Sequence, residues 1–263
     1  MISNTVTHDD VTALALRAGP MPADDVLRLA LERFAPAVAV SSSFGAEDMV
    51  LVDMVAKIDP KTRIFTLDTG RLPQETYNVI DATRSRYGLG IDVYFPQADA
   101  VQSMVAEHGV NLFYHSVDNR KLCCGVRKME PLRRALSSLD AWITGLRREQ
   151  SVTRTDVPKV EWDGANGLVK FNPLAEWTHA DVWTYIRANN VPYNALHDRG
   201  YPSIGCGPCT RAVQPGEHER AGRWWWEHPD TKECGLHVQS PESPLDDARG
   251  DPERVEGSKV DGL

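Results

Sequence analysis

The sequence predicts an α/β protein: a Rossmann-like, mostly parallel sheet with helices on both faces. Two observations carry this prediction. Short apolar segments alternate with amphipathic segments along the chain, in the order strand, helix, strand, helix. In that order each helix returns the chain to the same end of the sheet, so successive strands run parallel. The chain has 263 residues, 41% of them hydrophobic, which is enough to bury one large core.

The first two strand and helix pairs follow one another closely. AVAVSSSF (37–44) is a buried-strand candidate, and AEDMVLVDMVAKID (46–59) has the apolar content of a buried helix. RIFTLDT (63–69) alternates like a strand, and LPQETYNVIDATRSRYG (72–88) follows it as a helix. These segments predict a first β-α-β-α unit.

The same alternation continues through the middle of the chain. IDVYFP (91–96) is a predicted strand and ADAVQSMVAEHG (98–109) a predicted helix. GVRKMEPLRRALSSLD (125–140) is a further helix, and the strand AWITGL (141–146) follows it. The last predicted helix is THADVWTYIRANN (178–190), with its first residue as N-cap and an Asp three positions later.

The ends of the chain differ from the middle in composition. Residues 1–22 are expected to form a loosely ordered segment. Residues 238–263 are rich in Pro, Gly, Asp and Glu, which predicts a flexible, disordered tail. A single domain is expected over residues 23–237, and its C-terminal end is expected to form a flexible arm.

The charge balance restricts the partners. The formal net charge is −8, which disfavours nucleic acid and anionic membranes, because both would repel the average surface of the protein. Any anionic ligand then needs a local basic pocket. No segment is long and apolar enough to span a bilayer, and the first residues do not form an export signal, so a cytoplasmic location is expected. The sequence leaves the oligomeric state open, a homo-oligomer included.

Five cysteines are an odd number for a chain without an export signal, which favours metal binding or redox chemistry over structural disulfides. Two of them, Cys123 and Cys124, are adjacent, and a Cys-Gly-Pro-Cys motif contains Cys206 and Cys209. Four thiolates can hold a zinc ion or an iron–sulfur cluster. Adjacent ligands favour the larger group, while a vicinal disulfide or buried structural cysteines remain alternatives.

Three polar motifs follow predicted strands, where ligands of parallel sheets bind. SSSFGAED (41–48) opens a helix, so its backbone N–H groups can face an anion, although an ordinary Ser-capped turn has the same residues. LDTGR (67–71) is also common turn chemistry. ITGLRREQS (143–151) contains adjacent arginines that either bind a phosphate or lie in a solvated loop.

Together these motifs, with CCGVRK and the late KECGLH, resemble the assimilatory adenylylsulfate reductases, the iron–sulfur branch of the sulfonucleotide reductase family. The six motifs occur in order between residues 37 and 237. The resemblance implies a fold like that of the adenine nucleotide alpha hydrolases, related to PP-loop enzymes. It also implies a [4Fe–4S] cluster held by Cys123, Cys124, Cys206 and Cys209, and a nucleophilic thiol at Cys234.

The resemblance also assigns roles to charged and polar residues. It nominates His237, Lys128, Arg220 and Arg223 for the sulfate end of the substrate. The nucleotide would be held by Ser41, Ser42, Ser43, Phe44, Gly45, Leu67, Asp68, Thr69, Gly70 and Arg147. By resemblance, the enzyme reduces adenylylsulfate to sulfite and AMP through an S-sulfonate on Cys234, and a thioredoxin or glutaredoxin-like protein supplies the electrons. The motif around Cys234 is polar, which suits a flexible arm: Cys234 must first close on the substrate and later be accessible to a protein reductant.

Other functions remain as alternatives. The sister activity on 3′-phosphoadenylylsulfate needs extra cations for one more phosphate, and charge counting alone does not exclude it. An ATP-dependent iron–sulfur tRNA-thiolating enzyme is disfavoured by the acidic balance and by the Ser-Ser-Ser-Phe-Gly loop, which departs from the Ser-Gly-Gly-x-Asp-Ser pattern. The third alternative is a non-enzymatic, metal-stabilised nucleotide-binding regulator. The histidines at 115, 179 and 197 show no metal-like spacing and are interpreted as structural.

Overall fold

A computed structural model of the chain describes residues 7–150 and 156–228. It contains a six-stranded sheet in the order β3-β2-β1-β4-β6-β5, in which all neighbours are parallel except the antiparallel pair β5–β6. The strands are β1 (Val38–Ser41), β2 (Arg63–Leu67), β3 (Ile91–Tyr94), β4 (Ala141–Ile143), β5 (Val160–Asp163) and β6 (Leu168–Phe171). The predicted parallel sheet is therefore confirmed.

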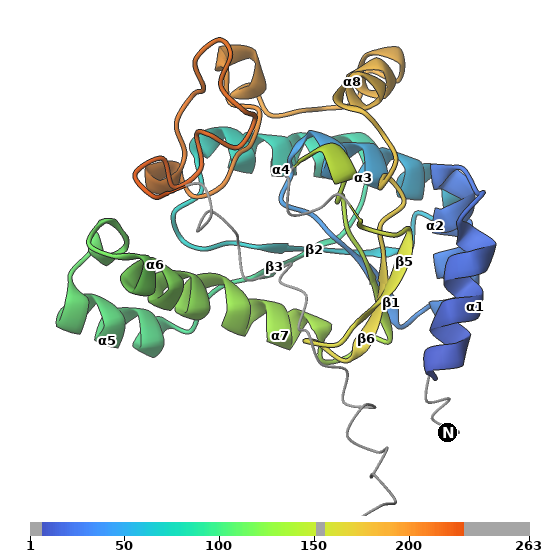
Figure 1. Cartoon of the computed structure of the whole chain (residues 1–263), viewed down its shortest axis with the longest axis horizontal. Helices are drawn as coiled ribbons and strands as arrows, with labels where there is room; N and C mark the ends of the chain where they lie inside the picture. Colours follow the sequence, from blue (N-terminus) through green and yellow to red (C-terminus); the bar gives the residue numbers. More distant parts are fainter. Residues whose placement is uncertain (1–6, 151–155, 229–263) are drawn as a thin grey trace, which may run out of the picture.

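Helices cover both faces of this sheet, as expected. Figure 1 shows α3 and α4 on one side of the sheet and α5, α6 and α7 on the other. The α-helices are α1 (His8–Ala18), α2 (Ala23–Phe34), α3 (Ala46–Ile58), α4 (Gln74–Tyr87), α5 (Ala98–His108), α6 (Val117–Cys124), α7 (Glu130–Leu136) and α8 (His179–Ala188). Among the described residues, no helix is long and apolar enough to cross a membrane.

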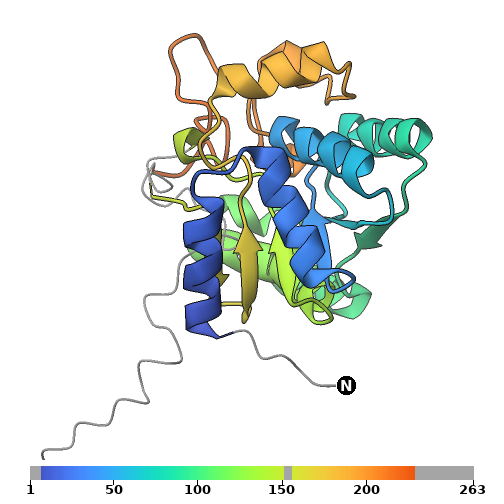
Figure 2. The same cartoon turned by 90° about the vertical axis from the view of Figure 1, so that its right-hand side faces the viewer.

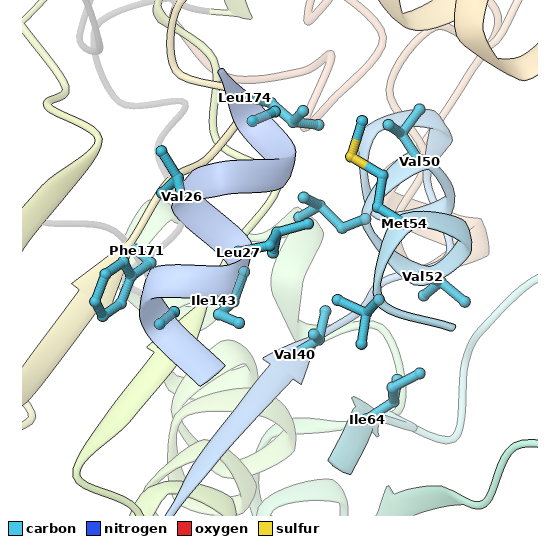
Figure 3. Close-up of a cluster of buried hydrophobic side chains, with 14 of the residues drawn as sticks. Val26, Leu27, Val40, Val50, Val52, Met54, Ile64, Ile143, Phe171 and Leu174 are labelled. Carbon is cyan, nitrogen blue, oxygen red and sulfur yellow. The ribbon is translucent and has the colours of Figure 1, made fainter. Parts of the chain in front are cut away.

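The main core lies between the sheet and α2 and α3. Alternate residues of each strand point to opposite faces, so Val40 of β1 packs here while its neighbour Ala39 faces the other layer. Figure 3 shows Leu27 of α2, Met54 of α3 and Ile143 of β4 meeting in this cluster. A smaller cluster on the opposite face joins α7 to the sheet.

Two features of the fold correct the expectations from sequence. Residues 8–18 are not loosely ordered: they form α1, which begins with a complete capping box between Thr7 and Asp10 and packs against β5 (Figure 2). Residues 160–171 form the β5–β6 hairpin, which the alternation did not predict. Residues 1–6 and the predicted tail over 238–263 lie outside the described residues.

The helix predicted over 125–140 is in reality a composite. α6 ends at Cys124, a π-helical turn, η2 (Gly125–Met129), follows, and α7 continues to Leu136. Such turns insert a residue into a helix and occur often at functional sites. The predicted strands over 37–44 and 141–146 are shorter, because the chain turns away from the sheet after Ser41 and after Ile143. The Thr178 and Asp181 cap is confirmed as a capping box.

Candidate active site

A pocket lies at the carboxyl ends of β1 and β4. The strand order changes direction here: β2 and β3 extend the sheet beyond β1 on one side, and β4 begins the other side. Ligands of open α/β sheets bind at such a point, because the loops leaving the two strands diverge. We call it the switch-point pocket. Its walls include Ser41 at the end of β1 and Ser43 after it, and Thr144 and Gly145 after β4. The C-terminal segment contributes Pro202, Ser203, Ile204, Glu219, Arg220 and Arg223.

The serine loop forms a self-contained turn at the start of α3. Ser43 donates two hydrogen bonds to Asp48 Oδ2, from its backbone N–H at 2.6 Å and from its hydroxyl at 2.7 Å. Phe44 is fully buried and adopts a left-handed backbone with φ of 58°. A carboxylate of the chain itself therefore lies where an anion was expected, and Ser42 and Phe44 face inward while Ser41, Ser43 and Gly45 line the pocket.

Asp48 is consequently an acidic group in the wall of the switch-point pocket. Burial raises the pKa of this carboxyl to about 6, and the bonds from Ser43 oppose the shift. Gly145 passes so close that a Cβ there would overlap the Asp48 carboxylate. The absence of a side chain at Gly145 is thus required for the loops after β1 and β4 to meet.

The LDTG turn is stabilised by hydrogen bonds to its own aspartate. Asp68 Oδ1 accepts hydrogen bonds from the Gly70 N–H at 2.7 Å and from the Tyr77 hydroxyl at 3.1 Å, while Gly70 has a φ of 72°. Thr69 is fully buried, and its hydroxyl lies 3.2 Å from Cys206 Sγ. The structure therefore brings this turn to the cysteines. Leu67, Asp68, Thr69 and Gly70, all described, do not line the switch-point pocket.

All four paired cysteines line a second, smaller pocket, which we call the thiol pocket. Cys123 and Cys124 come from the end of α6, and Cys206 and Cys209 flank the short helix η6 (Gly207–Cys209). All four are free thiols. They surround a cavity instead of converging on one point, and within residues 7–150 and 156–228 no three His, Cys, Asp or Glu side chains form a site for a single metal ion.

The electrostatics of the thiol pocket favour neutral thiols. Burial, followed by the neighbouring thiols Cys206 and Cys124, raises the pKa of Cys209 to about 12. Burial also raises the pKa of Cys123, and the nearby Arg127 opposes that effect. Thiolate ligands must be deprotonated, so four thiolates together in this apolar site require a bound cationic group.

The donor set fits an iron–sulfur cluster. Neighbouring residues of a helix point about 100° apart, so the side chains of Cys123 and Cys124 reach different corners of a shared cavity. Phe113 and Trp224 give the cavity apolar walls, and Arg127 contributes a charge whose Nε is buried without a partner in the described chain. Sulfur ligands at several corners, apolar walls and an unpaired donor suit a cationic iron–sulfur core that, together with its four thiolates, carries a net negative charge.

Two cations belong to both pockets. Lys128 of η2 and Arg223 line the switch-point pocket and the thiol pocket alike, while Arg220 lines the former. The Arg223 guanidinium lies over Trp224, 4.9 Å from the ring centroid, and a Cβ at Gly205 would overlap it. The structure therefore brings together the three cations that the sequence nominated for one anionic end of a ligand.

Arg147 behaves differently from its expected role. Its guanidinium is fully buried and forms an ion pair at 2.8 Å with Glu47 and another at 3.7 Å with Glu219. Both carboxylates line the switch-point pocket, whereas Arg147 does not. In this conformation Arg147 supports the pocket wall from behind, and direct contact with a nucleotide stays a prediction.

The C-terminal segment is attached to the cysteine helix by a buried ion pair. Arg120 of α6 donates from Nε and Nη2 to the two carboxylate oxygens of Glu227, each at 2.9 Å. Arg120 also lies over the buried Trp224 ring at 4.8 Å. Trp225, in contrast, is exposed. The sequence-predicted Cys234 and His237 lie outside the described residues.

Three pocket residues were not nominated from the sequence: Asp48, Arg127 and His197. Arg127 lies inside the quoted CCGVRK motif without an assigned role. His197 reaches the pocket through packing between distant segments, so local spacing gives no signal for it. Asp48 was quoted within the serine motif, and its position at the third residue of α3 is the signal that it caps the preceding loop. Arg71, the last residue of the LDTGR motif, donates to Val110 O at 2.5 Å and lies over Phe113 in the thiol pocket.

Comparisons with known proteins agree with this geometry. Residues 37–212 match the family described as the phosphoadenosine phosphosulfate reductase domain. The chain is 58% identical over 201 residues to an adenosine 5′-phosphosulfate reductase of Burkholderia cepacia, covering 76% of this chain and 80% of the relative. It is 50% identical over 235 residues to the Pseudomonas aeruginosa strain LESB58 protein of the same name, with 87% of each chain covered.

Solved structures give the same fold. A phosphoadenylyl-sulfate reductase from Candida auris, in a phosphate complex, matches with a TM-score of 0.69 and 29% identity, covering 80% of this chain and all (100%) of that one. An FMN adenylyltransferase from Candida glabrata matches with a TM-score of 0.51 at 16% identity, over 88% of this chain and 78% of that one, which supports the fold alone.

Proposed function

Because this chain belongs to the phosphoadenosine phosphosulfate reductase domain family, we propose that it reduces adenylylsulfate to sulfite and AMP in sulfate assimilation. The curated relatives at 50% to 58% identity are named adenosine 5′-phosphosulfate reductases. The resemblance inferred from the sequence motifs is confirmed at the level of the family.

One observation carries the proposal beyond the family. The switch-point pocket and the thiol pocket share Lys128 and Arg223, so an anion in the first would lie beside the cysteines in the second. At about 4 Å each unit charge contributes on the order of a few kcal/mol at an effective dielectric of about 20. Lys128, Arg220 and Arg223 therefore suit the phosphosulfate end of the substrate, where negative charge is concentrated.

Cys123, Cys124, Cys206 and Cys209 are proposed to hold a [4Fe–4S] cluster. When bound, the cluster supplies metal–thiolate bonds that tie α6 to the 206–209 turn and places charge beside Lys128 and Arg223. Thr69 and Arg127 support this site from the LDTG side, because Arg127 Nη1 donates to the Thr69 carbonyl at 2.7 Å. The S-sulfonate route described next requires no electron from the cluster.

The proposed nucleophile is the Cys234 thiolate. It attacks the sulfur of adenylylsulfate, forming a sulfur–sulfur bond while the bond between that sulfur and the bridging oxygen breaks, and AMP leaves with the electron pair. A dithiol reductant then attacks Cys234 Sγ and releases sulfite, and its second thiol resolves the mixed disulfide. The two electrons thus come from the reductant, which becomes a disulfide.

The described residues account for binding and charge compensation in this scheme. Lys128, Arg220 and Arg223 offset the repulsion between a thiolate and an anionic substrate. His237, which lies outside the described residues, is proposed to assist at the same end. The nucleotide would occupy the crevice between the loops after β1 and β4. We propose a thioredoxin or glutaredoxin-like protein as reductant and a cytoplasmic location, where the described thiols would remain reduced.

The test compares adenylylsulfate and 3′-phosphoadenylylsulfate with anaerobically purified protein, thioredoxin and a sulfite readout. We expect adenylylsulfate to be preferred by at least about tenfold in kcat/KM, equivalent to roughly 1.4 kcal/mol. Cys234→Ser should keep its iron and bind AMP, yet form no S-sulfonate detectable by mass spectrometry. Turnover by that variant would refute the nucleophile, and equal use of both nucleotides would favour the sister activity.

A further inference from the structure

His197 lies in the wall of the switch-point pocket and has one ring nitrogen without a partner. Nε2 is buried, and no group in residues 7–150 or 156–228 hydrogen-bonds to it. Buried polar side-chain atoms nearly always have a partner, so an unpaired one beside a pocket points to a bound ligand. The other nitrogen is accounted for, because the backbone of Tyr201 hydrogen-bonds to the imidazole.

The ring is held in place by two helices. His197 opens the short helix η5 (His197–Arg199), and its backbone N–H donates to the Asn194 carbonyl at 3.0 Å. Asn194 is itself fixed to α4 by a hydrogen bond to the Thr76 hydroxyl at 3.1 Å. The Trp183 ring of α8 packs edge-on against the imidazole at 5.3 Å. The backbone of η5 and the Trp183 ring therefore hold the imidazole against the wall of the pocket.

The environment favours a neutral imidazole. Burial lowers the pKa of His197, and the negative charges of Glu47 and Asp198 and the backbone bond to Tyr201 oppose it less strongly. A neutral imidazole has one donor and one acceptor nitrogen. The Tyr201 backbone raises the pKa of the ring, as a carbonyl acceptor does, and since Nε2 has no partner we assign the N–H to Nδ1, which leaves Nε2 with a lone pair that can only accept.

We propose that Nε2 of His197 accepts a hydrogen bond from the adenosine half of the substrate. The inference rests on the proposed function, which supplies a nucleotide for this pocket. Adenylylsulfate has hydrogen-bond donors at the adenine 6-amino group and at the ribose hydroxyls, whereas the ionised phosphosulfate has none. An acceptor therefore recognises the nucleoside, and His197 complements the cations that suit the other end.

The experiment measures AMP binding to the anaerobic holoenzyme by calorimetry. His197→Phe keeps an aromatic ring against Trp183 but removes the acceptor, and we expect about five- to tenfold weaker binding. His197→Gln restores an acceptor near the position of Nε2 and should recover part of the affinity. His108→Phe on α5, which lies outside the pocket, serves as the matched control and should bind AMP like the wild type.

Three analogues identify the donor and separate binding from a structural effect. Purine riboside 5′-monophosphate lacks the 6-amino group, and 2′-deoxy-AMP and 3′-deoxy-AMP each lack one hydroxyl. The analogue that lacks the bonded donor should bind the wild type and His197→Phe equally. Unchanged AMP affinity in His197→Phe, or an equal loss for AMP and all three analogues, would overturn the assignment. Failure of the wild type to bind AMP would instead overturn the proposed function, and this inference with it.

Discussion

Replacing Glu227 by Met should destabilise the protein strongly. Glu227 and Arg120 form a two-bond ion pair in which the side chains are 3% and 2% exposed. Glu227→Met keeps the volume but leaves the Arg120 guanidinium buried without its carboxylate.

The magnitude follows from this burial. Removing one partner of a buried ion pair costs about 3–5 kcal/mol, whereas replacing both partners by apolar residues of similar size is often close to neutral. For a domain of this size 1 kcal/mol corresponds to about 2–4 °C. We therefore expect Glu227→Met to lower the melting temperature by on the order of 10 °C, and Arg120→Met with Glu227→Met to recover much of it.

Thermal unfolding of the anaerobic holoenzyme, followed by circular dichroism, measures both variants. The matched control is Asp92→Met, because Asp92 pairs with Arg63 at 3.4 Å with side chains 52% and 37% exposed. An exposed pair contributes at most about 1 kcal/mol, so this control should shift the melting temperature by only a few degrees. A Glu227→Met shift no larger than that of the control, or a double variant less stable than the single, would refute the reasoning.

Two further predictions concern the pockets. Cys206→Ser should lose iron and acid-labile sulfide and melt earlier, since the 206–209 turn is no longer tied to α6; metal analysis checks this, and a variant with full iron content would exclude Cys206 as a ligand. Because burial raises the pKa of Asp48 to about 6 from an ordinary value of 3.8, its protonated form stabilises the fold fully below about pH 4, and this contribution is lost as pH rises through 6. Asp48→Asn should therefore gain stability relative to wild type between pH 5 and 7.5, and a constant difference in melting temperature would contradict the assignment.

The central sheet could be predicted from sequence because its strands are short apolar runs bounded by helical patterns. Residues 46–58 form α3 within one residue of the predicted helix, since a long apolar segment leaves few alternatives. The β5–β6 hairpin lacked such a signal, because Lys170 lies inside a strand and is stabilised by the Glu161 carboxylate at 3.0 Å. That pairing is a tertiary contact between strands, which hydropathy along the chain does not show.

The pocket residues likewise include some that the sequence could identify and others that only tertiary packing reveals. The paired cysteines could be recognised because their spacing is itself the chemical signal, and the structure brings all four to one cavity. The role of Arg147 could not be predicted from its motif, because its guanidinium is paired with Glu47, which is 100 positions earlier in the chain. His197 was interpreted as structural for the converse reason, since only the packing of η5 against α4 and α8 directs its ring to the pocket.

Because Lys128 and Arg223 line both pockets, a ligand bound in one pocket should change the affinity of the other pocket for its own ligand. An anion bound at the strand ends and the thiolates of the cysteines would both interact with the positive charges of Lys128 and Arg223. The binding free energies of the two sites are therefore coupled through these shared residues. Thermodynamic reciprocity then fixes the relation: whatever factor the metal group changes in nucleotide affinity, the nucleotide changes in metal-group affinity. The amount of iron that a chelator removes at equilibrium should accordingly depend on the concentration of AMP.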